Sequence, residues 1–255
     1  PAANLWADRV AEAFRRDSML CAQYNHDIAG GKWNGMMIQK HIGYTDWHDN
    51  FERDMMPEVH RIDGNAHGGF THKAAGGYVA MEAEHYFSKA DGGEAAWTVI
   101  PYMGRTLSGI SLQPYTKPVD GASLTYRFTT PEKTGGDTKE VKVHIIVKST
   151  LDFLNKGGLT YSVALDGGGP QTVNFNKNLN EEGDNTYTVY YPTVARRVVE
   201  SVVTLPLGNG HDGTHELVIT PNDPGIVFEK IVVDMGGYKP SYLFMDASVK
   251  ERTKP

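Results

Sequence analysis

The 255-residue sequence contains one cysteine, Cys21, and therefore no pair that could form an intramolecular disulfide. The absence of disulfides does not indicate whether the chain resides in a reducing or an oxidising compartment. Cys21 lies within an apolar helical pattern, where a small buried thiol is the ordinary role and a nucleophile is the exception. We therefore do not expect cysteine chemistry to carry the function.

Long apolar runs are also absent. No segment approaches the roughly 20 apolar residues that a transmembrane helix needs, and the N-terminus lacks the charged and then apolar layout of a signal peptide. We therefore expect a chain without a membrane span or a targeting segment. The residues themselves indicate no cellular location.

Dense clusters of basic residues are missing as well. The 25 lysines and arginines face 31 aspartates and glutamates, which leaves a net charge of −6. Nucleic acids and anionic membranes require a basic surface, so neither is expected as a partner. The apolar share of 40% is sufficient for a globular protein with a buried core.

The first part of the chain is helical in pattern. Between Asn4 and Ile28 the apolar positions follow a helical period, and Gly30 and Gly31 then end the helix. A second, shorter helix is predicted from Trp33 to His41. The helical segment is therefore assigned to residues 1–47, and the irregular residues 48–75, rich in glycine, are predicted to form a connector.

Residues 76–255 alternate in the manner of β-strands. About ten short runs are separated by Gly, Pro, Asn and Asp, which predicts a mainly β fold. The expected architecture is an antiparallel two-sheet β-sandwich of the carbohydrate-binding-module or jelly-roll type, preceded by one or two α-helices. The core is predicted to include Val79, Met81, Ile110, Leu112, Val143, Ile145, Val163, Val218, Ile231 and Val233.

Common catalytic motifs do not occur. There is no phosphate-binding Gly-Lys-Ser/Thr loop, no Gly-x-Ser-x-Gly, no Cys-x-x-Cys and no His-Glu-x-x-His. Glu82 and Glu84 point to the same side of one predicted strand and are the nearest approach to a carboxylate pair, although an exposed strand face explains them equally well. The histidines and aspartates between His26 and Asp54 match no known metal-site spacing, so solvated or interface-bonded side chains are the ordinary explanation.

Several segments nevertheless resemble one family. The stretch "NHDIAGGKWNGMMIQKHIGYTDW" from Asn25 resembles the end of the helical domain of glycoside hydrolase family 115, the xylan α-1,2-glucuronidases. The stretches "IPYMGRTLSGISLQP", "LTYSVALDGGGPQTVN" and "NDPGIVFEKIVVDMGGYKPSYL" resemble that family's C-terminal β-sandwich, in the same order. The resemblance covers nearly the whole chain.

The resemblance implies a role within a larger enzyme. In the family a (β/α)₈ barrel, N-terminal to the segments matched here, carries the catalytic acid and base, and this chain has no alternating pattern of that kind. No catalytic residue is therefore assigned, and the isolated chain is expected to be inactive. The parent enzyme would remove glucuronic or 4-O-methylglucuronic acid from glucuronoxylan or another uronic-acid-bearing polysaccharide. The alternative is an independent carbohydrate-binding or scaffolding module.

The same resemblance also implies partners and a location. The partners of this chain would be the uronic-acid-bearing polysaccharide and the missing N-terminal barrel, and a homodimer is compatible with the family. The parent is expected to be a secreted or periplasmic bacterial protein. No cofactor is expected to be required.

The stretch from Asn25 to Trp47, called the aromatic segment below, has a composition that suits the mouth of a sugar pocket. Aromatic rings stack on the apolar face of a pyranose, and amide, ammonium and imidazole groups bind hydroxyls or a uronate. Sealing one domain against another is the competing role for the same side chains. The candidate substrate-binding residues are Asn25, Lys32, Trp33, Asn34, His41, Tyr44 and Trp47.

A structural calcium ion is a further expectation from resemblance. The stretch "YVAMEAEHYF" resembles the first strand of carbohydrate-binding modules of families 6 and 35, which often hold Ca²⁺ through acidic residues of the first and last strands. The corresponding positions are Glu82, Glu84 and Glu229. Glu229 stands where an aspartate is usual, so the match at this position is incomplete.

Overall fold

The computed structural model describes residues 2–43, 53–59, 61, 67–131, 140–208 and 212–252. The chain divides into two compact units, Pro1–Ala66 and His67–Pro255, which are described separately. Neither α-helix in the described ranges has the length and apolar character needed to cross a bilayer.

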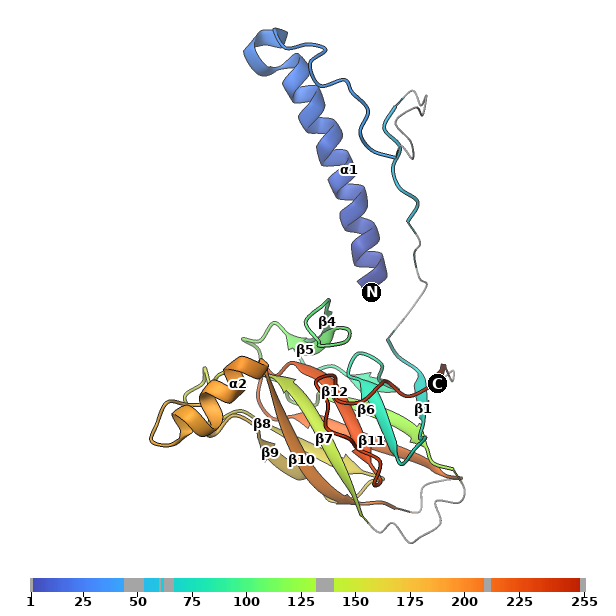
Figure 1. Ribbon diagram of the computed structural model, residues 1–255, viewed down its shortest axis with the longest axis vertical. Coiled ribbons are helices and arrows are strands. Elements are labelled where there is room, and N and C mark those ends of the chain that lie inside the picture. The colour runs from blue at the N-terminus through green and yellow to red at the C-terminus, as the bar shows by residue number, and fades with distance from the viewer. Residues whose placement is uncertain are drawn as a thin grey trace. The chain divides into compact units, whose positions relative to one another are not determined.

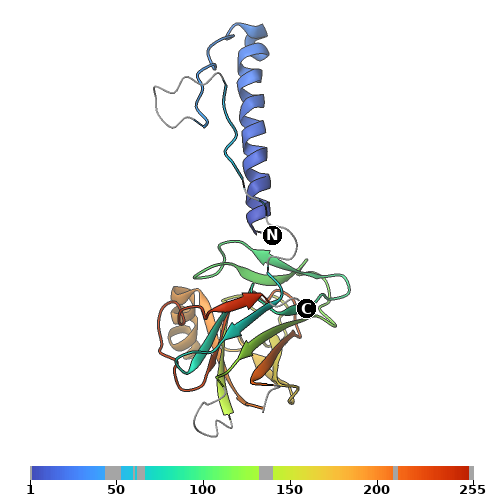
Figure 2. The ribbon, with the colours of Figure 1, turned by 90° about the vertical axis from the view of Figure 1, so that its right-hand side faces the viewer.

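The N-terminal unit is built on one long helix, α1 (Ala2–His26), shown unbroken in Figure 2. A 3₁₀ turn, η1 (Ile28–Gly31), comes after it, and Ala29, Gly30 and Gly31 adopt positive φ angles of 52°, 62° and 82°. Right-handed helix cannot continue through such residues, so the predicted stop at the glycine pair is confirmed.

The second predicted helix, from Trp33 to His41, is wrong. The chain there forms consecutive turns, with Gly35 at a φ of 86° and no regular helix up to Gly43. Its apolar residues Met36, Met37 and Ile38 are adjacent in sequence and exposed, so they form no stripe that a helix could bury. Without such a face a short helix gains too little to offset its nucleation cost.

The chain after η1 runs back along α1. Asp54 accepts hydrogen bonds from the amides of His41 and Ile42, each at 2.7 Å. Phe14 of α1 and Met55 and Met56 of the returning segment line a cavity of about 660 Å³. Phe14 thus lies against the segment that was predicted to be a connector. Trp6 is exposed, and the Arg9 guanidinium lies 4.7 Å from its ring centre.

The C-terminal unit is a β-sandwich of two sheets (Figure 1). The first sheet has the spatial order β13 (Lys250–Arg252), β1 (Phe70–Lys73), β6 (Ser123–Thr129), β11 (Thr214–Pro221), β8 (Thr160–Leu165) and β9 (Gln171–Asn174), and β3 (Ser88–Ala90) also pairs with β6. The second has the order β10 (Val198–Pro206), β7 (Glu140–Lys148), β12 (Phe228–Asp234), β5 (Gly109–Gln113) and β4 (Ala96–Ile100), and β2 (Tyr78–Glu82) also pairs with β12.

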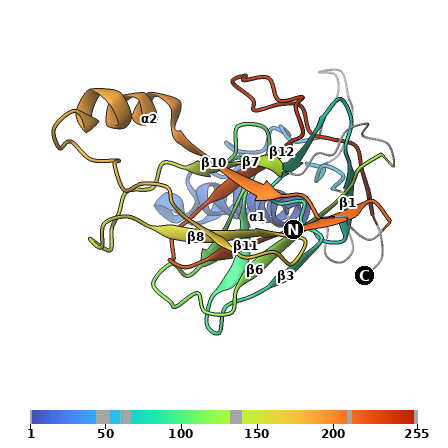
Figure 3. The ribbon, with the colours of Figure 1, turned by 90° about the horizontal axis from the view of Figure 1, so that it is seen from below.

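Figure 3 shows these sheets as two layers, β10, β7 and β12 in one and β8, β11, β6 and β3 in the other. Among the strands of the described residues, β1 and β6 pair in parallel and the other pairs are antiparallel. β1 lies within residues 48–75, which the sequence predicted to be a connector. A π-helical turn, η2 (Thr186–Tyr190), and a short helix, α2 (Tyr191–Arg196), interrupt the strands and were not predicted.

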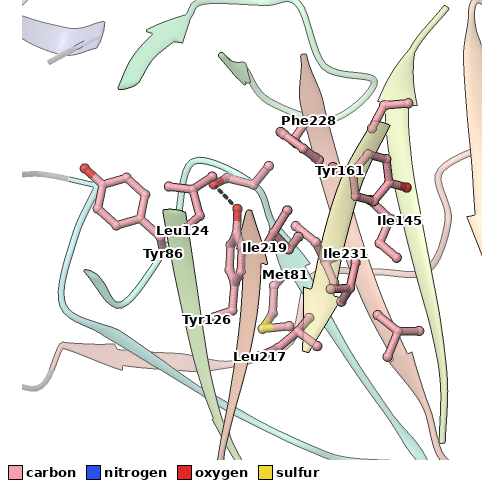
Figure 4. Packing of buried hydrophobic residues seen from close by; sticks show 14 of the residues in the cluster. Met81, Tyr86, Leu124, Tyr126, Ile145, Tyr161, Leu217, Ile219, Phe228 and Ile231 are labelled. Atoms are coloured by element: carbon pink, nitrogen blue, oxygen red, sulfur yellow. Dashed lines mark hydrogen bonds between the residues drawn. The ribbon is translucent and has the colours of Figure 1, made fainter. Parts of the chain in front are cut away.

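The core lies between the layers. Nine of the ten predicted core residues are confirmed, but Val218 is only half-buried because β11 turns its neighbours Leu217 and Ile219 inward. Three consecutive apolar residues in "LVI" fit either face of a strand, so alternation alone could not choose the buried one. Tyr126 is fully buried, and its hydroxyl donates to the Ala83 carbonyl at 2.8 Å (Figure 4).

We predict that Leu217→Ala destabilises the chain far more than Val218→Ala. A buried leucine truncated to alanine loses about 2–5 kcal/mol of unfolding free energy, whereas a half-buried valine loses below about 1 kcal/mol. Urea unfolding followed by tryptophan fluorescence measures both. Equal losses would mean that the face of β11 assigned here is wrong.

Candidate functional site

The aromatic segment is held to α1 by Asn25. Its side-chain amide donates to the Met37 carbonyl at 2.8 Å, and its carbonyl oxygen accepts from the Met37 amide at 3.0 Å. The side chain is buried. Asn25 is a predicted sugar-binding residue, and both its side-chain nitrogen and its side-chain oxygen bind the backbone of Met37.

The neighbouring candidates face outward. Trp33 is 37% exposed, and the Lys32 ammonium lies 5.0 Å from its ring centre. Asn34 is exposed. Together these three residues form a small surface with one ring face, one cation and one amide. Tyr44 and Trp47, the remaining aromatic candidates, lie outside the described residues.

His41 links three parts of the N-terminal unit. Its Nε2 lies 3.1 Å from the Asp17 carboxylate of α1, and its Nδ1 lies 3.1 Å from the Gln39 carbonyl. These hydrogen bonds, the one to Asp17 foremost, raise the pKa of His41, which favours the cationic form. The amides of Ile42 and His41 in turn lower the pKa of Asp54.

The predicted calcium residues lie in the sandwich and are buried rather than on an open strand face. Glu82 and Glu229 are 3% and 2% exposed. β2 is covered on both sides, since Ala80 packs with Ile146 and Phe244 in a second apolar cluster beyond the main core. The exposed face predicted for Glu82 and Glu84 is therefore wrong.

Glu82 is paired with a lysine. Its Oε1 lies 3.1 Å from Nζ of Lys230 on the adjacent strand β12, and it accepts a 2.7 Å hydrogen bond from the Thr106 hydroxyl. Nζ of Lys230 also donates to the carbonyls of Leu243 and Met245, each at 3.0 Å. Three oxygen acceptors thus surround one buried ammonium group.

Glu229 is neutralised in a similar way. Its Oε1 lies 3.0 Å from Nζ of Lys148 on β7, and its Oε2 accepts from the Arg105 amide at 3.1 Å. The Arg105 guanidinium donates to the Tyr242 carbonyl at 2.7 Å and lies 3.9 Å from the Tyr242 ring centre. It also donates to the Arg196 carbonyl at the end of α2.

Glu84 stands apart from both pairs. It comes after β2, and its carboxylate lies beside His67 and His85. Burial raises the pKa of Glu84, and burial lowers the pKa of His67 to about 4 and that of His85 to about 3. Within the described ranges, no compact group of metal-ligating side chains includes Glu82 or Glu229.

Lys230, Lys148 and Arg105 were not predicted from the sequence. The detectable signal was "FEK" within an otherwise apolar strand, where a glutamate and a lysine side by side interrupt a buried run. Charged residues in such a position are rarely buried unless they are paired. The partners come from other strands, and no single-sequence pattern identifies them.

A loop platform at one end of the sandwich carries exposed aromatic rings. Tyr115 and Phe153 are 54% and 42% exposed, and their rings meet nearly perpendicularly with centres 5.9 Å apart. The Asp152 carboxylate accepts hydrogen bonds from the amides of Lys156, Gly157 and Gly158 at 2.8–2.9 Å, which orders the loop. A rigid aromatic surface of this kind is suited to stacking on a sugar ring.

We predict that Lys230→Met lowers the unfolding free energy by about 3–5 kcal/mol, because it leaves the Glu82 carboxylate buried without its cation. The double variant Glu82→Gln/Lys230→Met should recover most of that loss. Chemical denaturation at pH 7 measures this double-mutant cycle.

The surface pair Lys73–Glu251 provides the control, because both side chains are at least half exposed. Lys73→Ala should change stability by no more than about 1 kcal/mol. Additive losses in the Glu82–Lys230 cycle would contradict the assigned pairing.

The sandwich matches a known protein family. The model of the glycosyl hydrolase family 115 C-terminal domain matches residues 70–246. A comparison with curated proteins gave no significant match. Among solved structures, the chain is similar to BtGH115A, described as a family GH115 4-O-methyl-alpha-glucuronidase with specificity for decorated arabinogalactans. The identity is 18% and the TM-score 0.41, and the match covers 88% of this chain and 24% of that one.

Two carbohydrate-binding modules are also similar. The C-terminal CBM6 of LamC from Zobellia galactanivorans has 12% identity and a TM-score of 0.39, with 62% of this chain and 98% of that chain covered. A family 35 module from Clostridium thermocellum has 13% identity and a TM-score of 0.39, with 61% and 97% covered. The chain spans about a quarter of the length of BtGH115A. Because the family model matches more than half of its residues, this chain belongs to glycosyl hydrolase family 115 and contains that family's C-terminal domain.

Proposed function

We propose that this chain is a non-catalytic C-terminal part of a family 115 enzyme that removes glucuronic or 4-O-methylglucuronic acid side chains from glucuronoxylan or a related polysaccharide. The match to the family's C-terminal domain over residues 70–246 is the observation that carries the proposal. The catalytic domain would lie in another part of such an enzyme.

The chemistry of the carboxylates supports a non-catalytic role. An inverting glycosidase holds an acid and a base about 6.5–9.5 Å apart across the scissile bond, with room for a water molecule between them. Glu82 and Glu229 are instead buried and paired with lysines. A carboxylate held by an ammonium group inside the sandwich can neither reach a glycosidic oxygen nor activate water.

Within such an enzyme, the surface formed by Lys32, Trp33 and Asn34 would contribute to substrate binding. The ring face of Trp33 would stack on a pyranose, and the Lys32 ammonium would attract the uronate carboxylate. His41, Tyr44 and Trp47 remain candidates in the same segment. Asn25 would support this surface from behind through its two bonds to Met37.

The test is release of uronic acid from aldouronic acid oligosaccharides by the chain alone and by the longer enzyme that contains it. We expect no release by the chain alone, because the acid and base pair would lie elsewhere in the enzyme. Turnover by the chain within tenfold of the longer enzyme, abolished by substitution of one of its own carboxylates, would overturn the proposal.

Trp33 variants of the longer enzyme sharpen the same test. Trp33→Ala should raise KM roughly tenfold at unchanged thermal stability, since a stacking aromatic contributes on the order of 1–1.5 kcal/mol, and Trp33→Phe should retain most of the affinity. A loss of stability in proportion to the loss of activity would instead assign Trp33 to a domain interface.

Sugar binding by the sandwich itself is a second candidate function. The observation that favours it is the ordered platform of Tyr115 and Phe153, where two aromatic rings are exposed on one surface. Phe153 packs on Gly225, where an added Cβ would come within 2.5 Å of the ring, so the platform is braced by the loop before β12.

We predict that Tyr115→Ala weakens binding of the chain to glucuronoxylan oligosaccharides about tenfold, as expected when one stacking ring is lost. Isothermal titration calorimetry measures the affinity. Tyr187→Ala is the matched control, because Tyr187 is a highly exposed tyrosine on η2, away from the platform residues in sequence. No binding by the unmodified chain, or equal loss in both variants, would rule this function out.

A further inference from the structure

His67, Glu84 and His85 form a compact cluster at the start of the C-terminal unit, with His67 and Glu84 buried and His85 partly exposed. Backbone hydrogen bonds hold its two segments together, from the Gly69 amide to the Phe87 carbonyl at 2.8 Å and from the Phe70 amide to the Tyr86 carbonyl at 3.3 Å. The His85 amide also donates to the Glu82 carbonyl at 2.8 Å, which closes a tight turn after β2. The side chains are therefore brought together by a rigid frame.

Several polar atoms of this cluster lack hydrogen bonds. Both ring nitrogens of His67 and Oε2 of Glu84 are buried without a partner, and these residues are 7% and 5% exposed. An unsatisfied polar atom in the interior costs about 1–3 kcal/mol, and native proteins rarely leave several together. These unsatisfied atoms are therefore available to bind a ligand.

The separations suit a metal ion better than hydrogen bonds. Nδ1 of His67 lies 3.4 Å from Oε2 of Glu84, and Nε2 of His85 lies 3.9 Å from Oε1 of the same carboxylate. A tetrahedral ion with bonds of about 2.0–2.1 Å places neighbouring ligand atoms about 3.3 Å apart. One ligand atom from each residue can be chosen so that all three lie within 4.8 Å of one another. Small side-chain rotations would complete the coordination.

We propose that His67, Glu84 and His85 bind one divalent transition-metal ion, with Zn²⁺ the best fit. Two imidazoles and one carboxylate are a donor set that zinc accepts, whereas calcium takes oxygen ligands. Three protein ligands leave the fourth position for water or a substrate oxygen. This site is distinct from the carboxylates of Glu82 and Glu229, which are paired with lysines.

Lys250 is a cation beside the cluster that opposes binding of the ion. Its Nζ lies 3.1 Å from Nδ1 of His85, and it also lies 5.4 Å from the Phe70 ring centre. The other ring nitrogen of His85, Nε2, therefore faces Glu84 and is the atom that would coordinate the ion. A positive charge next to a ligand weakens cation binding, so removing it should tighten the site.

The test is zinc uptake by the untagged chain after removal of bound metal with a chelator. We expect one zinc per chain by elemental analysis, and at least tenfold weaker binding in His67→Ala and in His85→Ala when zinc is titrated against a chromogenic chelator. Lys250→Met, which retains the aliphatic stem on Phe70, should bind zinc several-fold more tightly than the unmodified chain.

Controls separate this site from the rest of the chain. Cys21→Ser disables the second group of possible ligands found among the described residues, formed by Asp17, Cys21 and His41, and should leave zinc affinity unchanged. Substitution of Co²⁺ should give the intense visible absorption of a tetrahedral site, and His85→Gln should abolish it even if an alanine variant fails to fold. No zinc uptake, or uptake lost in Cys21→Ser and retained in both histidine variants, would overturn the proposal.

Discussion

The buried ion pair between Glu82 and Lys230 is the constraint on which one end of the sandwich depends. The two residues lie opposite each other on β2 and β12, with both strands covered on both faces. Two charges in such a place are tolerated only when each is fully paired. Lys230 meets this requirement by taking the carbonyls of Leu243 and Met245 as well, and so holds the segment after β12 in place although Phe244 and Met245 have positive φ angles of 54° and 70°.

The same requirement extends across this end of the sandwich. Glu229, like Glu82, is paired with a lysine, and its second oxygen fixes the Arg105 amide. Arg105 then joins the loop before β5 to Tyr242 and to the end of α2. A carboxylate that organises three segments in this way is a structural element. Glu82 and Glu229 are therefore both bound to lysines within the structure, so neither is a free carboxylate of the kind that glycoside hydrolysis uses.

Most of the sandwich could be predicted from the sequence because most of its strands alternate and end at turn-forming residues. The short strands β1, β3 and β13 were missed, since three or four residues with histidine, lysine or arginine show no period. The charged network could not be predicted for a different reason. Alternation in "YVAME" assigns Glu82 to a face of the strand but does not identify the residues that cover that face, which lie far away in the sequence, as Ile146 and Phe244 do.

Glu84 differs from Glu82 and Glu229 because its carboxylate lies beside two histidines and forms no direct ion pair with a lysine among the described residues. Glu82 and Glu229 each have a lysine ammonium within 3.1 Å, but Glu84 faces two imidazoles that burial keeps neutral. Burial raises the pKa of Glu84, and the Ser108 hydrogen bond and the Lys250 charge oppose that rise. Proton uptake is one way to remove a charge from the interior. A divalent ion is the other way, and it would also satisfy the histidine nitrogens that a proton on Glu84 leaves without partners. Glu82, Glu229 and Glu84 are all buried carboxylates that require a counter-charge. For Glu84, that counter-charge can come from an ion bound from the solvent.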